Sequence, residues 1–167
     1  DKVAGTWSLW KVSLGRGPET RSRYLPVFVS DEGRTLQPTA RAVWDALAAL
    51  EAEDGLLRPA HLSGEAARGI AEEAEVAARV AAEGVYRELL SRHEEETRRR
   101  KRNGESAFEA RRTMIERVGL LSVRHHRLQK LQTEREAWER EIAARSHVVP
   151  NLTPVVLVRL ARKGELK

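Results

Sequence analysis

Hydrophobic and polar residues alternate in two stretches near the start of the chain, and this period of two predicts two β-strands. Residues 6–14 (TWSLWKVSL) and 23–30 (RYLPVFVS) both alternate and are rich in aromatic and β-branched residues. Pro26 has no N–H to donate to a neighbouring strand, so we expect the second strand to lie at a sheet edge or to contain a bulge. Residues 31–33 (DEG) predict the turn that follows it.

A helical period replaces the alternation from about Pro38 to Glu53, with proline in the first turn, where helices tolerate it best. Its expected apolar stripe is Ala42, Leu47 and Leu50, with Val43 beside Ala42 and Trp44 off to the side.

A second helical pattern begins after Ser63, a good N-cap residue, and we expect this helix to cover residues 64–102. Its apolar positions are close to a heptad repeat, and their small side chains predict a neighbouring helix at short distance. These positions are Ile70, Ala74, Ala77, Ala81, Val85 and Leu89.

The chain then has no apolar residue over residues 91–106, which a packed helix tolerates poorly. Apolar periodicity returns in two further helical segments, residues 105–118 and 122–146, separated by Gly119. Pro150 ends the last helix, and residues 153–161 (TPVVLVRLA) form the third strand candidate.

Helix lengths predict how these segments are connected. Residues 64–102 would form a helix about 58 Å long, and the two return helices together would also span about 58 Å. A turn at Asn103-Gly104 would therefore bring Pro150 back to the first strands, whereas a turn at Gly119 would leave the C-terminus short of the sheet. We expect the turn at Asn103-Gly104.

The predicted fold class is α+β and mostly α, with an antiparallel sheet of about three strands, one helix, and a long antiparallel helical hairpin. Residues 1–62 and 150–167 would form a small base, and residues 63–149 a coiled-coil arm with its tip near 98–106. We expect Trp7, Trp10 and Trp44 in the core of the base and Trp138 in the core of the hairpin.

The charge is unevenly distributed along the 167 residues, which carry 30 basic and 25 acidic side chains for a net charge of +5. Residues 1–102 are neutral in sum, residues 103–149 contribute +2 and residues 150–167 contribute +3. The neutral sum conceals a local concentration of positive charge. An acidic run, Glu94-Glu95-Glu96, is followed after Thr97 by the basic run Arg98-Arg99-Arg100-Lys101-Arg102.

Several classes of function lack their sequence signals. The absence of cysteine excludes disulfides, thiolate nucleophiles and cysteine-based metal sites. Phosphate-binding glycine loops, the dinucleotide fingerprint, the H-E-x-x-H zinc motif and the G-x-S-x-G elbow are also missing. Because these motifs are missing, we expect no cofactor. We also expect no membrane association, because no apolar run approaches the roughly 20 residues that a membrane span requires. Residues 1–3 do not resemble a signal peptide, and we expect a cytoplasmic location. The chain does not begin with Met, so we expect a piece of a larger or processed protein.

The histidines do not form a convincing metal site. His125 and His126 are adjacent, so on a helix they point in directions about 100° apart. His93 and Glu96 have the spacing of a carboxylate-bridged metal motif, but this motif needs equivalent pairs on other helices. We therefore expect that no metal is bound and that this segment has no catalytic activity.

Basic side chains are the remaining candidates for function. A hairpin tip that carries Arg98, Arg99, Arg100, Lys101 and Arg102 could bind phosphate groups, with Arg111 and Arg112 adding to the surface. A further basic stretch continues through Arg117, Arg124 and Arg127, where Glu116 is the opposing charge. The alternative interpretation is a solvated, charged tip with no nucleic-acid ligand.

Three stretches of the chain resemble the C-terminal accessory region of bacterial SWI/SNF-type DEAD/DEAH-box helicases, including the helicase-like component of DISARM phage-defence systems. They are TWSLWKVSL…YLPVFVSDEGRTLQPTARAVWDAL, GESAFEARRTMIERVGLLSVRHHRLQKLQTEREAWEREI and VVPNLTPVVLVRLA. The sequence departs from the family pattern at Leu121-Ser122, where that pattern has Pro-Glu. The matching positions are Trp10, Val12, Pro26, Val27, Phe28, Val29, Asp31, Gly33, Arg34, Ala107, Phe108, Arg111, Arg112, Ile115, Glu116, Arg117, Gly119, Leu120, Pro150, Leu152, Leu157 and Arg159.

This resemblance implies that the parent protein is an ATP-dependent DNA translocase and that this segment is a non-catalytic accessory domain. Its implied partners are the motor lobes of the parent, duplex DNA and a partner subunit of a defence complex. A protein–protein interaction module whose coiled-coil arm docks a partner subunit without touching DNA is the alternative. An independent small enzyme is a third possibility, which the lack of a catalytic constellation disfavours.

Overall fold

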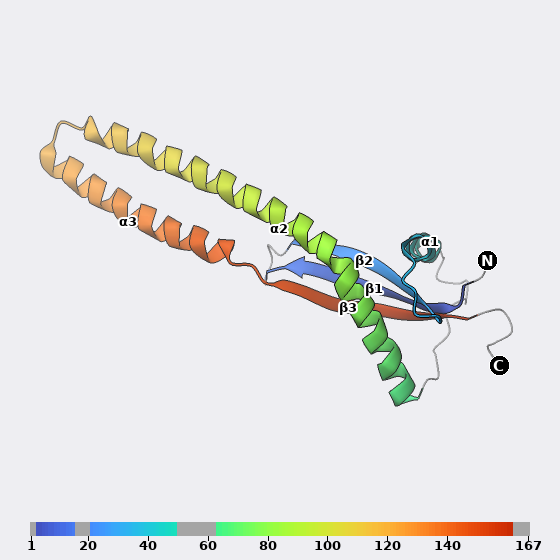
Figure 1. Ribbon diagram of the computed structural model, residues 1–167. Coiled ribbons are helices and arrows are strands. Elements are labelled where there is room, and N and C mark those ends of the chain that lie inside the picture. The colour runs from blue at the N-terminus through green and yellow to red at the C-terminus, as the bar shows by residue number, and fades with distance from the viewer. Residues whose placement is uncertain (1–2, 16–20, 50–62, 162–167) are drawn as a thin grey trace. The chain divides into compact units, whose positions relative to one another are not determined.

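The computed structural model describes residues 3–15, 21–49 and 63–161, and these residues form two compact units (Figure 1). The sheet unit is drawn from residues 1–87 and 150–167, and the hairpin unit from residues 88–149. The predicted boundary after residue 62 was therefore too early, because the first part of the long helix belongs to the sheet unit.

The sheet unit contains three antiparallel strands: β1 (Gly5–Leu14), β2 (Arg21–Ser30) and β3 (Pro150–Leu160). Their order is β2-β1-β3, so the strand from the end of the chain joins the two from its beginning. With helices α1 (Gln37–Ala48), α2 (Gly64–Glu116) and α3 (Leu121–Ser146), this arrangement confirms the predicted α+β, mostly helical fold class.

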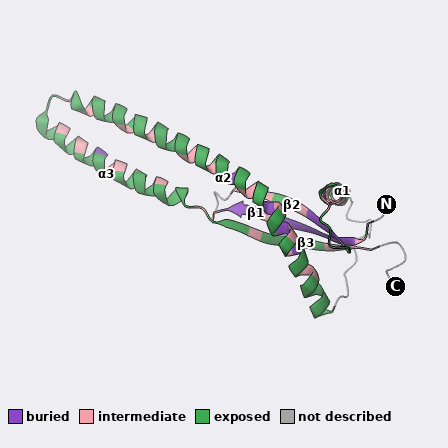
Figure 2. Cartoon of the chain, viewed as in Figure 1, coloured by how far each residue is buried: buried purple, intermediate pink, exposed green. Residues whose placement is uncertain are grey.

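The central strand β1 is covered on both faces, and nearly all of its residues are buried (Figure 2). On one face, Trp7 and Phe28 pack with Ala40 of α1. On the other face, Trp10 packs with the first part of α2. The alternation of the strand thus supplies two small cores, one for each helix.

The indole N–H groups of both buried tryptophans are hydrogen-bonded within the sheet unit. The indole N–H of Trp7 donates to the carbonyl oxygen of Ala40 at 2.9 Å, and that of Trp10 donates to Oγ of Ser8 at 2.8 Å. Trp44 is half-buried and stacks on Trp7 with ring centroids 6.1 Å apart. The prediction that these three tryptophans belong to the core of the base is confirmed.

Both edges of the sheet carry a proline. Pro26 lies in the edge strand β2, as predicted. In β3, Pro154 pairs with Trp10 and Val156 pairs with Leu9, so Val155 is an extra residue in a β-bulge. Because proline cannot donate a ladder hydrogen bond, edges and bulges are the positions in a sheet that accommodate it.

The apolar face of α1 differs in part from the predicted stripe. Ala40 is buried, and Val43, Trp44 and Leu47 pack against the core around Trp7. Ala42 is exposed, so its assignment to the stripe was wrong. Leu50 and the predicted end of this helix lie outside the described residues.

Ser63 caps α2 as predicted, because its Oγ accepts a hydrogen bond from the N–H of Ala66 at 3.2 Å. The alanine face of this helix packs against the sheet rather than against another helix. Ala74 and Ala78 are buried beside Trp10, Val27 and Val29. Small side chains allow close approach to a sheet as readily as to a helix, so the heptad-like spacing did not identify the neighbour.

The predicted turn at Asn103-Gly104 is wrong, because α2 continues without interruption to Glu116 and the chain turns at residues 117–120. The tip therefore lies at residues 117–120 and not near 98–106. Within the hairpin unit, α2 runs from Glu88 to Glu116 and α3 returns antiparallel beside it (Figure 1). Residues 64–87 pack in the sheet unit, so counting them as part of the arm placed the turn too early.

Candidate nucleic-acid interface

The five-residue basic run, Arg98 to Arg102, lies in the middle of α2 and all five side chains are exposed. Successive residues of a helix are rotated by about 100°, so five consecutive side chains point to all sides of the helix. The run consequently does not form one basic surface, as it would have done in a tight hairpin tip.

Part of this run is neutralised within the helix. Nη1 of Arg98 lies 2.9 Å from the carboxylate of Glu95, and Nη2 of Arg102 lies 3.8 Å from it. Arg99, Arg100 and Lys101 form no ion pair with any residue that the structure describes. Three exposed cations therefore remain uncompensated here, on different sides of the helix.

Arg111 and Arg112, the other two predicted phosphate-binding residues, both have acidic partners. Arg111 reaches across the hairpin to Glu134 of α3, with 2.7 Å between Nη2 and Oε2. Arg112 bonds Glu116 one helical turn further on, at 3.0 Å, and this hydrogen bond raises the pKa of the guanidinium. The charges of both residues are therefore paired with carboxylates, and Arg111 also links the two helices of the hairpin.

Positive charge also gathers at the closed end of the hairpin, which we define as residues 111–130. This segment contains six basic residues and one acidic residue, so its net charge of +5 equals that of the whole chain. Arg117, Arg127 and Lys130 are exposed and form no ion pair with described residues. Arg117 and Arg127 were noted in the second basic stretch but not assigned to the site, and Lys130 was missed.

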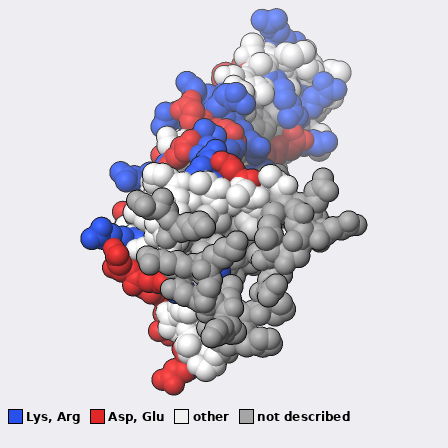
Figure 3. Space-filling view, turned by 90° about the vertical axis from the view of Figure 1, so that its right-hand side faces the viewer, with Lys and Arg blue, Asp and Glu red and all other residues white. Residues whose placement is uncertain are grey.

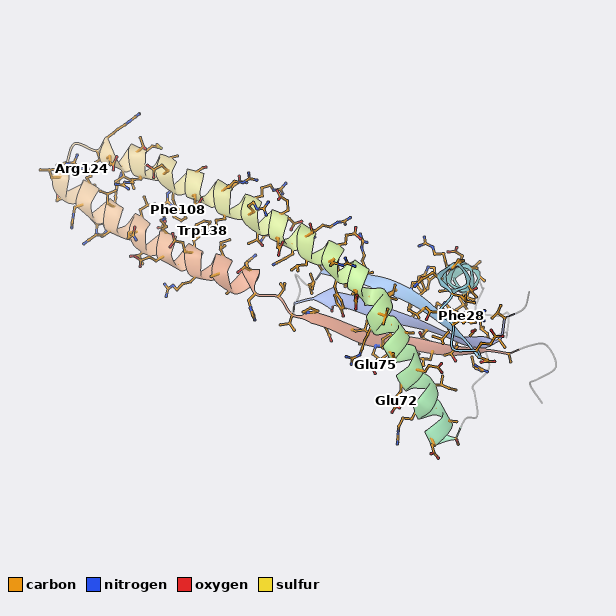
Figure 4. All side chains as sticks on the ribbon, in the orientation of Figure 1. Phe28, Glu72, Glu75, Phe108, Arg124 and Trp138 are labelled. Carbon is orange, nitrogen blue, oxygen red and sulfur yellow. The ribbon has the colours of Figure 1, made fainter. Side chains whose placement is uncertain are left out.

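Arg124 has a different role at the closed end (Figure 4). Its Nη1 donates to the carbonyl oxygen of Glu116 at 3.3 Å, at the C-terminal end of α2. The last turn of α2 has no basic residue of its own, and the last carbonyls of a helix favour positive charge. Arg124 thus supplies from α3 the cation that this helix end lacks.

Exposed apolar side chains accompany these cations. Leu120 and Leu121 are 68% and 71% exposed, and Met114 on α2 is 70% exposed. A groove of about 370 Å³ lies beside them between the two helices, lined by Met114, Ile115 and Leu131 together with the charged side chains Arg111, Arg127, Lys130 and Glu134. The closed end therefore combines positive charge with apolar surface.

Interhelical contacts hold the hairpin in register. Phe108 and Trp138 face one another between the helices, with ring centroids 5.4 Å apart (Figure 4), so Trp138 lies in the hairpin core as predicted. Further along, Nε2 of His93 lies 3.0 Å from the carbonyl oxygen of Arg145. This histidine contacts the backbone of α3, which gives it a structural role that the His93/Glu96 spacing did not suggest.

Among the residues that the structure describes, no three His, Asp or Glu side chains are grouped as they would need to be to hold a metal ion. His125 and His126 are exposed. The described helices include none that is long and apolar enough to span a membrane. Comparisons with known protein families, curated proteins and solved structures found no match to this chain.

Proposed function

We propose that this chain is a non-catalytic accessory domain that contacts duplex DNA through the closed end of its hairpin. The observation that carries the proposal is the net charge of +5 within residues 111–130, including three exposed cations without acidic partners among the described residues. The sequence resemblance supports a parent protein that is an ATP-dependent SWI/SNF-type helicase or translocase, whose motor lobes would be the other partner.

Phosphate binding requires cations that are not already paired within the protein, because each neutralised phosphate releases a condensed counterion from the DNA. Arg117, Arg127 and Lys130 meet this condition at the closed end. Exposed aliphatic side chains beside them do not oppose DNA binding, because they need not be desolvated by it. Binding through these groups would be independent of base sequence and strongly dependent on salt.

The test compares two triple variants that remove equal charge. The chain is titrated with a labelled duplex of about 20 base pairs at salt concentrations from about 50 to about 200 mM, and binding is followed by fluorescence anisotropy. We expect Arg117→Ser, Arg127→Ser and Lys130→Ser together to weaken binding and to reduce the slope of log K against log salt by about 3.

The matched control is the triple variant Arg99→Ser, Arg100→Ser and Lys101→Ser, which removes the same charge from the middle of α2. We expect a smaller change in slope, because these three side chains point to different sides of the helix. Equal effects of the two triple variants would show non-localised attraction, and unchanged binding in the first would exclude a DNA contact at the closed end.

A second candidate function is supported by the exposed leucines at the turn. Leu120 and Leu121 would be buried if the closed end docked a partner subunit, for example in a defence complex, without touching DNA. In that case Leu120→Ser with Leu121→Ser would abolish partner binding, and the chain would show no salt-dependent affinity for duplex DNA.

A further inference from the structure

The sheet unit contains an apolar groove that neither the sequence resemblance nor DNA binding explains. It has a volume of about 570 Å³ and lies between α2 and the segment that joins β2 to α1, with Val29 and Thr35 on one side and Val76, Ala77 and Val80 on the other. Val76 and Val80 are 65% and 68% exposed, although they lie one helical turn apart on a well-packed helix.

The surroundings of this groove are acidic. Residues 65–83 contain five acidic and two basic residues, and one of the basic residues, Arg79, is bonded to Glu75. Glu72, Glu73 and Glu83 form no ion pair with any described residue. From the helical spacing, these three carboxylates lie on the same side of α2 as the exposed valines.

The positions of two of these glutamates can be described from the structure. The carboxylate of Glu73 lines the groove and lies 3.9 Å from the position that a Cβ on Gly33 would occupy, so it reaches the turn after β2. Glu72 extends from the exposed side of the first part of α2 (Figure 4). Acidic side chains gather at the lower end of the space-filling view, over the first turns of this helix (Figure 3).

We infer that this groove docks a basic amphipathic helix of a protein partner, one that inserts two aliphatic side chains beside Val76 and Val80 and presents Lys or Arg to Glu72, Glu73 and Glu83. An apolar groove that receives residues one turn apart is a recurrent mode of helix recognition. Opposite charges around such a groove select the partner and speed its association.

Other occupants are disfavoured by the same carboxylates. A second copy that paired its α2 with this one would bring two sets of unpaired glutamates together, and like charges at an interface oppose association. Nucleic acids and anionic lipid surfaces would be repelled for the same reason. A basic amphipathic helix would bury the exposed valines and neutralise the unpaired carboxylates. This inference does not depend on DNA binding by the hairpin.

The test uses the full chain and a labelled helical peptide of about 18 residues, with leucines one turn apart and lysines flanking them. A matched peptide has glutamate in place of every lysine. Binding is measured by anisotropy, and ¹³C-methyl chemical shifts of the valines locate the site. We expect the lysine peptide to bind and to shift Val29, Val76 and Val80, and the glutamate peptide not to bind.

Two variants probe the groove and one serves as a control. We expect Val76→Ser with Val80→Ser, and separately Glu72→Gln with Glu73→Gln and Glu83→Gln, each to weaken binding about tenfold or more. All five residues lie outside the described cores, so circular dichroism should show unchanged folding. The control Met114→Ser with Leu121→Ser removes equally exposed apolar side chains from the hairpin unit and should leave binding unchanged.

Three results would overturn the inference. Equal binding of the two peptides would show that charge does not select the occupant. Equal losses in the groove variants and in the hairpin control would show non-specific adsorption. Self-association in sedimentation experiments that the Val76 and Val80 substitutions abolish would identify a second copy of the chain as the occupant.

Discussion

Gly104 shows how one residue can support two different structures. A glycine after asparagine suggests a turn, but here it lies inside α2 opposite the large ring of Trp138. A Cβ at this position would lie within 2.8 Å of three atoms of the indole. Glycine inside a helix costs about 0.5–1 kcal/mol relative to alanine, and the close packing of Trp138 against α2 offsets this cost.

We therefore predict that Gly104→Ala destabilises the hairpin by about 1–3 kcal/mol, because the indole has to move away from its contact with Phe108. The matched control is Gly84→Ala in the same helix, where an added Cβ meets nothing within 4 Å. This control should stabilise the chain by up to about 1 kcal/mol. Urea unfolding followed by circular dichroism measures both, and stabilisation by Gly104→Ala would contradict the proposed packing.

At the scale of the element, α2 serves two units with two different surfaces. Its first part packs alanines onto the sheet, and Ala74, Ala78 and Ala82 are buried. Its middle is polar on nearly all sides and is supported by pairs one turn apart, such as Glu88 with Arg92. Each such pair contributes only about 0.2–0.5 kcal/mol, so the hairpin also depends on its few interhelical contacts.

We predict that Ala78→Leu destabilises the sheet unit by about 1–3 kcal/mol, because Ala78 is fully buried in the cluster with Trp10, Val27 and Val29 and a larger side chain would overpack it. Ala67→Leu is the control, since Ala67 is exposed on the same helix and the substitution should change stability by less than about 0.5 kcal/mol. Thermal unfolding measures both changes. Equal and small effects would show that the alanine face does not pack tightly on the sheet.

Strands and helices were predictable because their periods of two and 3.6 are local signals, and the apolar run after Pro150 correctly predicted a third strand. The return of this strand to the sheet was predicted from helix lengths, and it holds although the turn that this argument required is wrong. The position of the turn was not predictable by the same means. The alanine pattern of α2 does not say whether a sheet or a helix covers it, and Gly104 and Gly119 are equivalent as breaks in a sequence. The long-range contact with Trp138 distinguishes them, and no local pattern encodes it.

The wrong position of the turn also led to a wrong choice of residues for the hairpin tip. With the turn at residues 103–104, the basic run would have formed the tip; with the turn at residues 117–120, Arg117, Arg127 and Lys130 belong to the closed end instead. The sequence pattern therefore indicates basic candidates in the C-terminal half of the chain, but it misplaces the hairpin tip that would carry them. It could not show that Arg111 and Arg112 are engaged by Glu134 and Glu116.

At the scale of the whole molecule, the two proposed surfaces lie on different units and differ in charge. The closed end of the hairpin unit is basic, with +5 over residues 111–130. The groove of the sheet unit lies in an acidic part of α2. Because no residue is shared between the two surfaces, variants in one should leave the binding measured at the other unchanged.

The assignment of the closed end rests on the antiparallel register of α2 and α3, and one distance tests this register directly. The chain has no cysteine, so Glu94→Cys with Ala144→Cys allows two spin labels to be attached at exposed positions near the contact of His93 with Arg145. Double electron–electron resonance should give a distance below about 25 Å if the hairpin closes at residues 117–120. A turn at Asn103-Gly104 would place residue 144 beside the start of α2, and a distance of about 40 Å or more would contradict our account.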